Sequence, residues 1–367
     1  MIASVRTERF QNQSNYHEIL SNHKPGNALH RASFPGFSHL FCIVDDCNHL
    51  IPKLTVMNKF VKISVSILFL TAWFAAISVA QSDRDIYRTE IFFTSDSPVV
   101  DIRTSGGYIN VTGTSSNEVE VKMIVKRGRN FLTPSDEDLS DYEITIIRDG
   151  DRIVAEATSD RSGWSGLFGS SRNISISFDV SVPEGATVDG RTSGGSISVA
   201  NLHNQVNMRT SGGSVKAENV SGNTDLRTSG GSITLAGVAG VMNARTSGGS
   251  IRVSDLMGEA ELRTSGGSIR LENIAAKLTA RTSGGNIRAH LVEFSDDVSL
   301  RTSGGSIRID MPYTQNYDLE LRGGRVDTEL HNFTGQAERN RINGKIGEGG
   351  PLLSARTSGS SVQINYQ

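Results

Sequence analysis

The sequence predicts an all-β chain that winds into a single-chain β-solenoid with about 18 residues per coil, on three observations. First, the segment Arg-Thr-Ser-Gly-Gly-Ser-Ile begins at Arg191 and returns every 18 residues at Arg209, Arg227, Arg245 and Arg263. Second, polar and apolar residues alternate on both sides of each copy, which is typical of half-buried strands. Third, a glycine pair separates the two alternating runs and gives the backbone freedom at a tight corner. A fixed period of this length is typical of stacked repeat architectures.

Three apolar columns appear when the copies are aligned. One stands just before the arginine, one follows it after the glycine pair, and the third lies between that position and the next copy. A coil that advances by one strand spacing per repeat turns each column into a ladder with about 4.8 Å between rungs. A glycine pair in every unit argues against helices. We expect the threonine after each arginine to point inward and to form a hydrogen bond, because an unpaired buried hydroxyl is costly.

The regular coils are predicted over residues 187–310, between two less regular regions. Residues 81–186 predict an irregular N-terminal β region that contains one outlying copy of the repeat. Residues 311–367 predict degenerate C-terminal capping coils, with a shortened copy at Arg322 and a final coil at Arg356. Atypical terminal repeats are expected because the ends of a stacked fold must close its core.

Two segments at the N-terminus are expected to be missing from the mature protein. Residues 57–80 combine a basic start, an apolar run and a small-x-small cleavage site, which predicts a signal peptide. An uncleaved membrane anchor is the alternative, although the run is short for a span and contains serine and threonine. Residues 1–56 are interpreted as a non-native upstream extension. They hold both cysteines, Cys42 and Cys47, whose spacing lacks the paired motif of a zinc finger.

Composition and motifs exclude several classes of function. The chain holds 37 Lys and Arg against 39 Asp and Glu, so it lacks the strongly basic balance of a nucleic-acid-binding protein. The glycine pairs are not followed by the aspartate of calcium-binding nonapeptide repeats, nor by the Gly-Lys-Ser/Thr of a phosphate loop. We therefore expect no catalytic residues, no metal, no cofactor, no nucleic-acid partner and no membrane span in the mature chain.

The chain resembles a bacterial adhesin-like family of β-solenoid domains of unknown function. The resemblance rests on Val182-Pro183-Glu184-Gly185 leading into the repeats, and on the glycine-rich turn at Gly350 before the last copy. It covers roughly residues 85–367. It implies the fold and an adhesive or structural role, and it implies no catalytic residues.

Two columns of basic residues form the candidate ligand-contact surface. Alternation turns the repeat arginines outward, and a second outward column follows the glycine corner, so the two are expected to form one basic face. Guanidinium groups bind phosphate and carboxylate through paired hydrogen bonds, which favours an anionic glycan as ligand. The alternative is a solvated surface, because acidic residues two positions before some arginines can pair with them. The candidates are Arg245, Arg252, Arg263, Arg270, Arg281, Arg288, Arg301 and Arg308.

The sequence thus predicts an exported cell-envelope protein with a non-catalytic structural or adhesin-like role in binding or as a scaffold. Its expected location is the periplasm, the outer surface or the medium, and its expected partner is an anionic envelope polysaccharide or another envelope protein. The alternative is a glycan-active enzyme, a polysaccharide lyase or hydrolase on a β-helix scaffold, which would need carboxylates clustered on one face. Only one break in the repeat carries acids, at Glu293, Asp296 and Asp297, and it is interpreted as a loop insertion.

The interpretation of the N-terminus makes a prediction about processing. If translation starts at Met57 and cleavage follows Ala80, N-terminal sequencing of the exported protein should begin at Gln81. Peptides from residues 1–56 in the native proteome would contradict it.

Overall fold

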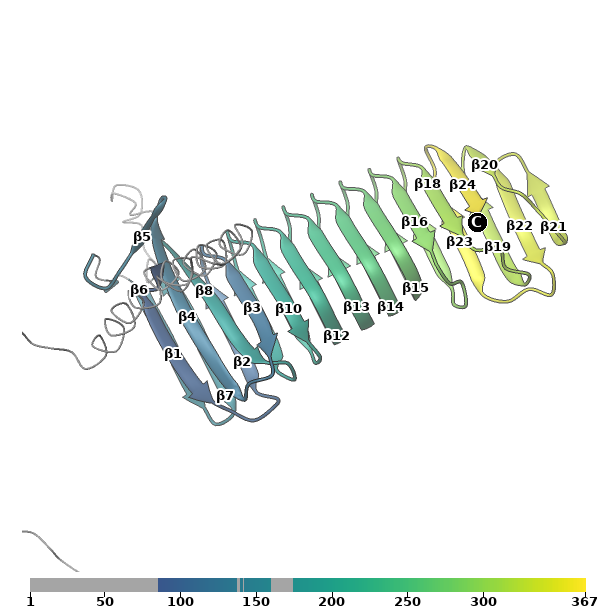
Figure 1. Ribbon diagram of the computed structural model, residues 1–367. Helices are drawn as coiled ribbons and strands as arrows, with labels where there is room; N and C mark the ends of the chain where they lie inside the picture. Colours follow the sequence, from purple (N-terminus) through teal and green to yellow (C-terminus); the bar gives the residue numbers. More distant parts are fainter. Residues whose placement is uncertain (1–84, 137–138, 141, 160–173) are drawn as a thin grey trace, which may run out of the picture. The chain divides into compact units, whose positions relative to one another are not determined.

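The computed structural model describes residues 85–136, 139–140, 142–159 and 174–367. The predicted upstream extension and signal peptide lie outside these residues. The chain divides into two compact units, Met1–Phe74 and Ala75–Gln367, and every described residue belongs to the second. The described residues form 24 strands joined in one continuous sheet, without an α-helix (Figure 1). The prediction of an all-β solenoid is confirmed.

The regular coils stack in parallel with a shift of one repeat per rung. Ile233 pairs with Ile251, and Ile251 pairs with Ile269, so that identical positions of successive copies lie side by side. The strands of this part are β9 (Thr187–Thr192), β10 (Ile197–Leu202), β11 (Val206–Thr210), β12 (Val215–Arg227), β13 (Ile233–Arg245), β14 (Ile251–Arg263), β15 (Ile269–Arg281), β16 (Ile287–Leu291), β17 (Val298–Arg301) and β18 (Ile307–Met311).

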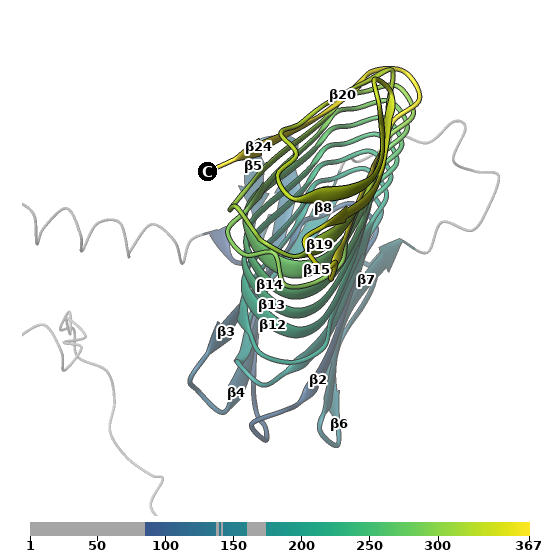
Figure 2. The same ribbon diagram turned by 90° about the vertical axis from the view of Figure 1, so that its right-hand side faces the viewer.

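Each coil has two walls, which Figure 2 shows in a view along the stack. The isoleucine wall contains β10, the first halves of β12 to β15, β16 and β18. The arginine wall contains β9, β11, the second halves of β12 to β15, and β17. The walls meet at the glycine corner, which is the Thr-Ser-Gly-Gly-Ser segment of each copy. On the side opposite the glycine corner, a short bend within each of the long strands β12 to β15 joins the two walls. We call this side the bend edge.

At the N-terminal end, the outlying copy of the repeat at Arg103 stacks directly on the regular coils. Its strands β2 (Val99–Thr104) and β3 (Ile109–Thr114) pair in parallel with β9 and β10. β7 (Arg152–Ser159) and β8 (Ile174–Pro183) form the next rung beyond them. Antiparallel strands then end the walls: β6 (Tyr142–Asp149) on β7, and β4 (Glu118–Arg127) on β8, with β1 (Arg88–Phe93) and β5 (Asn130–Leu132) on β4.

At the C-terminal end, the order of coils in space departs from their order in the sequence. β23 (Leu352–Arg356) lies between β17 and β19 (Tyr317–Arg322), and β24 (Ser361–Tyr366) lies between β18 and β20 (Arg325–Asp327). The expectation that the Arg356 copy is the final coil is therefore wrong. The full Arg-Thr-Ser-Gly copy matches the preceding coil better than the shortened copy does. The arginine wall ends with antiparallel β22 (Arg341–Ile346) and β21 (Phe333–Glu338).

The core is a set of apolar ladders between the walls. The three predicted columns are all buried; in one coil they are represented by Ala244, Ile251 and Leu256. Two further inward columns, at the positions of Val253 and Ala260, complete the interior. A single coil buries only about five such side chains, so each coil depends on its neighbours for a continuous core.

The glycine corner holds successive coils in register through a hydrogen bond that repeats from rung to rung. The Oγ1 atom of Thr246 donates to the carbonyl oxygen of Gly231 in the previous coil at 2.8 Å, and the amide of Gly249 donates back to Oγ1 at 3.3 Å. The same contact recurs from Thr192 to Thr357. The expectation of an inward, hydrogen-bonded threonine is confirmed.

The bend edge depends on left-handed backbone conformations. Asn201, Asn219, Asp255 and Asn273 have φ between 52° and 58°, and Gly237 occupies the same position with φ of 64°. Asn, Asp and Gly are the residues that adopt this conformation most readily. The amide of Asn219 also donates to Asn201 at 3.2 Å, and that of Asn273 to Asp255 at 3.0 Å, which extends the ladder along the edge. These residues recur every 18 positions, so the column can be recognised in the sequence.

The two glycines of the corner should differ sharply in tolerance to substitution. A Cβ on Gly249 would stand 2.0 Å from the carbonyl oxygen of Gly231, whereas a Cβ on Gly248 would stand 3.4 Å from that of Gly230. Gly249→Ala should lower the free energy of unfolding by about 3 kcal/mol or more, because the backbone of two coils must separate. Gly248→Ala, the matched control, should change it by about 1 kcal/mol or less. Chemical denaturation measures both, and equal losses would contradict the close packing at the corner.

The inserted position of the last coil predicts the effect of truncation. Deleting residues 352–367 removes the parallel neighbour of β19, which then keeps only antiparallel β22. Hydrogen exchange over residues 317–346 should become fast, while β12 to β14 remain protected. If protection over 317–346 persisted, the coil would be acting as an end cap and not as an internal rung.

Candidate functional site

The repeat arginines form one continuous column on the outer face of the arginine wall. The arginines of the full copies, from Arg103 to Arg356 in spatial order, each precede an inward threonine, so the alternation of the strand turns them outward. Strand pairing sets each arginine opposite the next, and directly opposite residues of the antiparallel pair β19 and β22 also share a face. We call this set the arginine column. In spatial order it contains Arg103, Arg191, Arg209, Arg227, Arg245, Arg263, Arg281, Arg301, Arg356, Arg322 and Arg341.

A second outward column, the companion column, lies two residues before each arginine from Arg191 to Arg322 in spatial order. Along its first part, carboxylates alternate with uncharged side chains. Asp225 contacts Arg227 at 2.8 Å and Arg209 at 3.7 Å, so one carboxylate serves two neighbouring rungs. Glu261 contacts Arg245 at 3.3 Å and also pairs with the next arginine. In spatial order the companion column contains Asp189, Asn207, Asp225, Asn243, Glu261, Thr279, Ser299, Ser354 and Glu320.

The alternation of the companion column stops at three hydroxyl residues, Thr279, Ser299 and Ser354. The neighbouring arginines Arg281 and Arg301 are exposed. Among the described residues, no ion pair or hydrogen bond engages either of their side chains. We call the stretch from Thr279 to Ser354 in this column the acidic gap. It leaves positive charge uncompensated next to the rungs from Arg209 to Arg263, where Asp225 and Glu261 pair with the arginines.

The arginine column borders a shallow groove of about 470 Å³ that runs across several rungs. Its lining consists of Arg245, Arg263, Arg281 and Arg301 with the threonines and serines of the glycine corners. It contains guanidinium and hydroxyl groups and no large apolar side chain. Such a surface can donate many hydrogen bonds to an anionic, hydroxyl-rich ligand.

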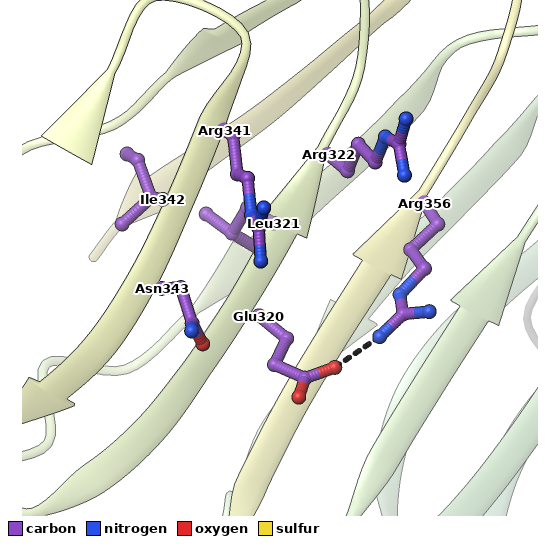
Figure 3. Close-up of a pocket in the computed structure, with 7 residues that line it drawn as sticks. All are labelled: Glu320, Leu321, Arg322, Arg341, Ile342, Asn343 and Arg356. Carbon is purple, nitrogen blue, oxygen red and sulfur yellow. Dashed lines mark hydrogen bonds and ion pairs between the residues drawn. The ribbon is translucent and has the colours of Figure 1, made fainter. Parts of the chain in front are cut away.

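The C-terminal part of the column is compensated by a single carboxylate. Figure 3 shows the guanidinium group of Arg356 turned toward Glu320, to which it is ion-paired. In the same view, no interaction joins Arg322 or Arg341 to the other residues drawn. A hollow of about 340 Å³ adjoins this part and is lined by Arg301, Arg322 and Arg356 among others. The basic groove therefore continues past β17.

The second predicted basic column lies on the other wall. Arg252, Arg270, Arg288 and Arg308 pair rung to rung along the isoleucine wall, and none of them lines the groove. Arg308 is 3.5 Å from Asp310, and no ion pair engages the other three among the residues that the structure describes. The expectation of one basic face is corrected to two separate columns. The glycine corner reverses the chain, so outward directions before and after it differ.

One of the three acids at the break in the repeat, Asp297, has a structural contact. The Oδ1 atom of Asp297 accepts a hydrogen bond from the amide of Leu352 at 2.8 Å, which ties the loop to the inserted coil. Phe294 from the same loop is buried, and its ring meets that of Tyr317 at 5.7 Å and 87°. Burial and the hydrogen bond with Tyr366 raise the pKa of the Tyr317 hydroxyl. The loop thus closes the bend edge over the core.

Within residues 85–136, 139–140, 142–159 and 174–367, no group of three or more His, Cys, Asp and Glu side chains is placed to hold a metal ion. Across the same ranges, none of the elements is a helix of the length and apolarity that crossing a bilayer requires.

Sequence reasoning missed part of the site. Arg322, Arg341 and Arg356 belong to the arginine column, but their order in the chain hides their order in space. The acidic gap was also missed, although the loss of acids two residues before Arg281 and Arg301 is visible in the sequence. Only the pairing of strands shows that one carboxylate contacts the arginines of two neighbouring rungs. The loss of acids at successive rungs therefore leaves their arginines without a partner.

Comparison with known proteins identifies the family. No curated protein matches the chain significantly. Similar solved structures include a candidate adhesin from Bacteroides fragilis (12% identity, TM-score 0.38) and a candidate lipid-binding protein from Parabacteroides distasonis (13%, 0.41), each matched over 76% of this chain and 96% of the other. A candidate cell-adhesion protein from Clostridium sporogenes matches over 76% and 99% of the two chains (12%, 0.20). The family of Toastrack DUF4097 domains matches residues 74–365, and the chain therefore belongs to that family.

Proposed function

We propose that this protein is an exported, non-catalytic, adhesin-like component of the cell envelope that binds an anionic polysaccharide through its basic columns. The observation that carries the proposal is the exposed arginine column, which lies beside a groove and is only partly compensated by carboxylates. A repeated array of identical groups suits a repetitive ligand, because the same contact can form at each rung. Another envelope protein with an acidic surface is the alternative partner.

The two basic columns have different roles in this proposal. The arginine column contacts the ligand directly, since the groove beside it offers guanidinium and hydroxyl donors together. Arg252, Arg270 and Arg288 on the isoleucine wall add long-range attraction, which is screened beyond about 8 Å at physiological ionic strength. The rate of ligand association should therefore depend on salt concentration, and the rate of dissociation should depend on the contacts with the arginine wall.

Binding assays with residues 81–367 test the proposal. The parent should bind polygalacturonate and dextran sulfate but not neutral dextran, and affinity should fall as salt rises. Reversal of Arg281 and Arg301 to Glu should abolish binding, because these side chains are exposed and unpaired.

Reversal of Arg252, Arg270 and Arg288 to Glu provides the comparison on the other wall. It should weaken binding by about tenfold or less at low salt and hardly at all at high salt. Thermal melting should remain near that of the parent for both variants, since solvent-facing positions contribute little to stability. Equal binding to neutral and anionic dextran would refute the proposed function.

A further inference from the structure

We infer that the acidic gap is the anion-binding site of this protein, and that its ligand is a linear anionic polysaccharide lying along the stack of coils. The site is centred on Arg281 and Arg301, on β15 and β17. This inference rests on the proposed function and gives it a location and a ligand geometry.

Electrostatics favour the gap over the compensated rungs from Arg209 to Arg263. Arginines on neighbouring rungs are about 4.8 Å apart at the backbone, and like charges directly opposite each other repel. From Arg209 to Arg263 this repulsion is offset, because Asp225 and Glu261 each contact two arginines. At Arg281 and Arg301 the described residues supply no such carboxylate. An anion from outside the protein therefore gains more at these two rungs than at the rungs from Arg209 to Arg263.

The side chains of the gap also match the chemistry of a charged sugar chain. Thr279, Ser299 and Ser354 are half-buried, and each places a hydroxyl group in the row beside the arginines. Hydroxyl groups donate to and accept from sugar hydroxyls, while guanidinium groups bind carboxylate or sulfate through two parallel hydrogen bonds. Each rung of the gap thus offers one donor of each type side by side, and the pair repeats along the stack with the period of the rungs.

The shape of the surface selects a long ligand over a small one. The groove extends over β13, β14, β15 and β17, and the hollow at Arg301, Arg322 and Arg356 continues it onto β23 and β19. A chain that crosses the gap thus meets further arginines on both sides. A lipid acyl chain does not fit, because the lining is arginine, threonine and serine and offers no apolar wall.

The test restores the missing carboxylate. Ser299→Asp re-establishes the alternation between Glu261 and Glu320 and pairs with Arg301 without removing any arginine. Asn207→Asp adds the same charge to the same companion column outside the groove and serves as the matched control. Asp225→Asn opens a second gap beside Arg209 and Arg227. Each variant of the chain 81–367 is titrated with polygalacturonate oligomers of increasing length, and its thermal melting is recorded.

We expect Ser299→Asp to weaken binding by about tenfold or more while leaving the melting temperature unchanged or higher. Asn207→Asp should bind within about twofold of the parent, Asp225→Asn should bind more tightly, and affinity should rise with oligomer length. Equal weakening by Ser299→Asp and Asn207→Asp would overturn the gap as the site and leave the proposed function standing. Affinity independent of oligomer length would overturn the linear ligand. A parent that binds no anionic chain would refute the proposed function and this inference together.

Discussion

At the glycine corners from Thr192 to Thr357, a threonine hydroxyl reaches the carbonyl oxygen of a glycine in the neighbouring coil, across a space too small for a Cβ. Thr246 and Gly231 are 2.8 Å apart at these atoms, and a side chain on Gly249 would collide with Gly231. This contact fixes which residue stands above which. Because a slip of one residue would turn every side chain to the opposite face, the buried ladders and the outer columns both depend on it.

The same register that builds the core creates an electrostatic problem on the surface. Stacking identical repeats sets isoleucine on isoleucine, which stabilises the interior, but it also sets arginine on arginine. Alternate carboxylates in the companion column resolve this over the first part of the arginine wall. The arrangement stops at Thr279 and Ser299, where stacked arginines have no carboxylate beside them. This is where we propose that an external anion binds.

The repeat ends with a change in strand direction at both ends of the arginine wall and at the N-terminal end of the isoleucine wall. β6 and β4 at one end and β22 and β21 at the other run antiparallel to their neighbours, which ends the repeat without another copy of it. Near both ends, a copy of the repeat from elsewhere in the chain is inserted as a rung: β2 and β3 lie between β9 and β10 on one side and β7 and β8 on the other, and β23 lies between β17 and β19. This exchange of order extends the arginine column to Arg356, Arg322 and Arg341.

The sequence alone determined the solenoid, its period, the inward and outward faces of the regular coils and the buried role of the threonine. These follow from alternation and from an 18-residue repeat, which are local properties of the chain. Only the tertiary structure decided that Arg252 and Arg281 lie on different walls. The spacing of residues in the repeat does not indicate the direction that the chain takes after the glycine corner. Only strand pairing decided that Arg356 precedes Arg322 in space and that Asp225 compensates two arginines. Contacts between coils come from residues far apart in the chain, and no local pattern records their order.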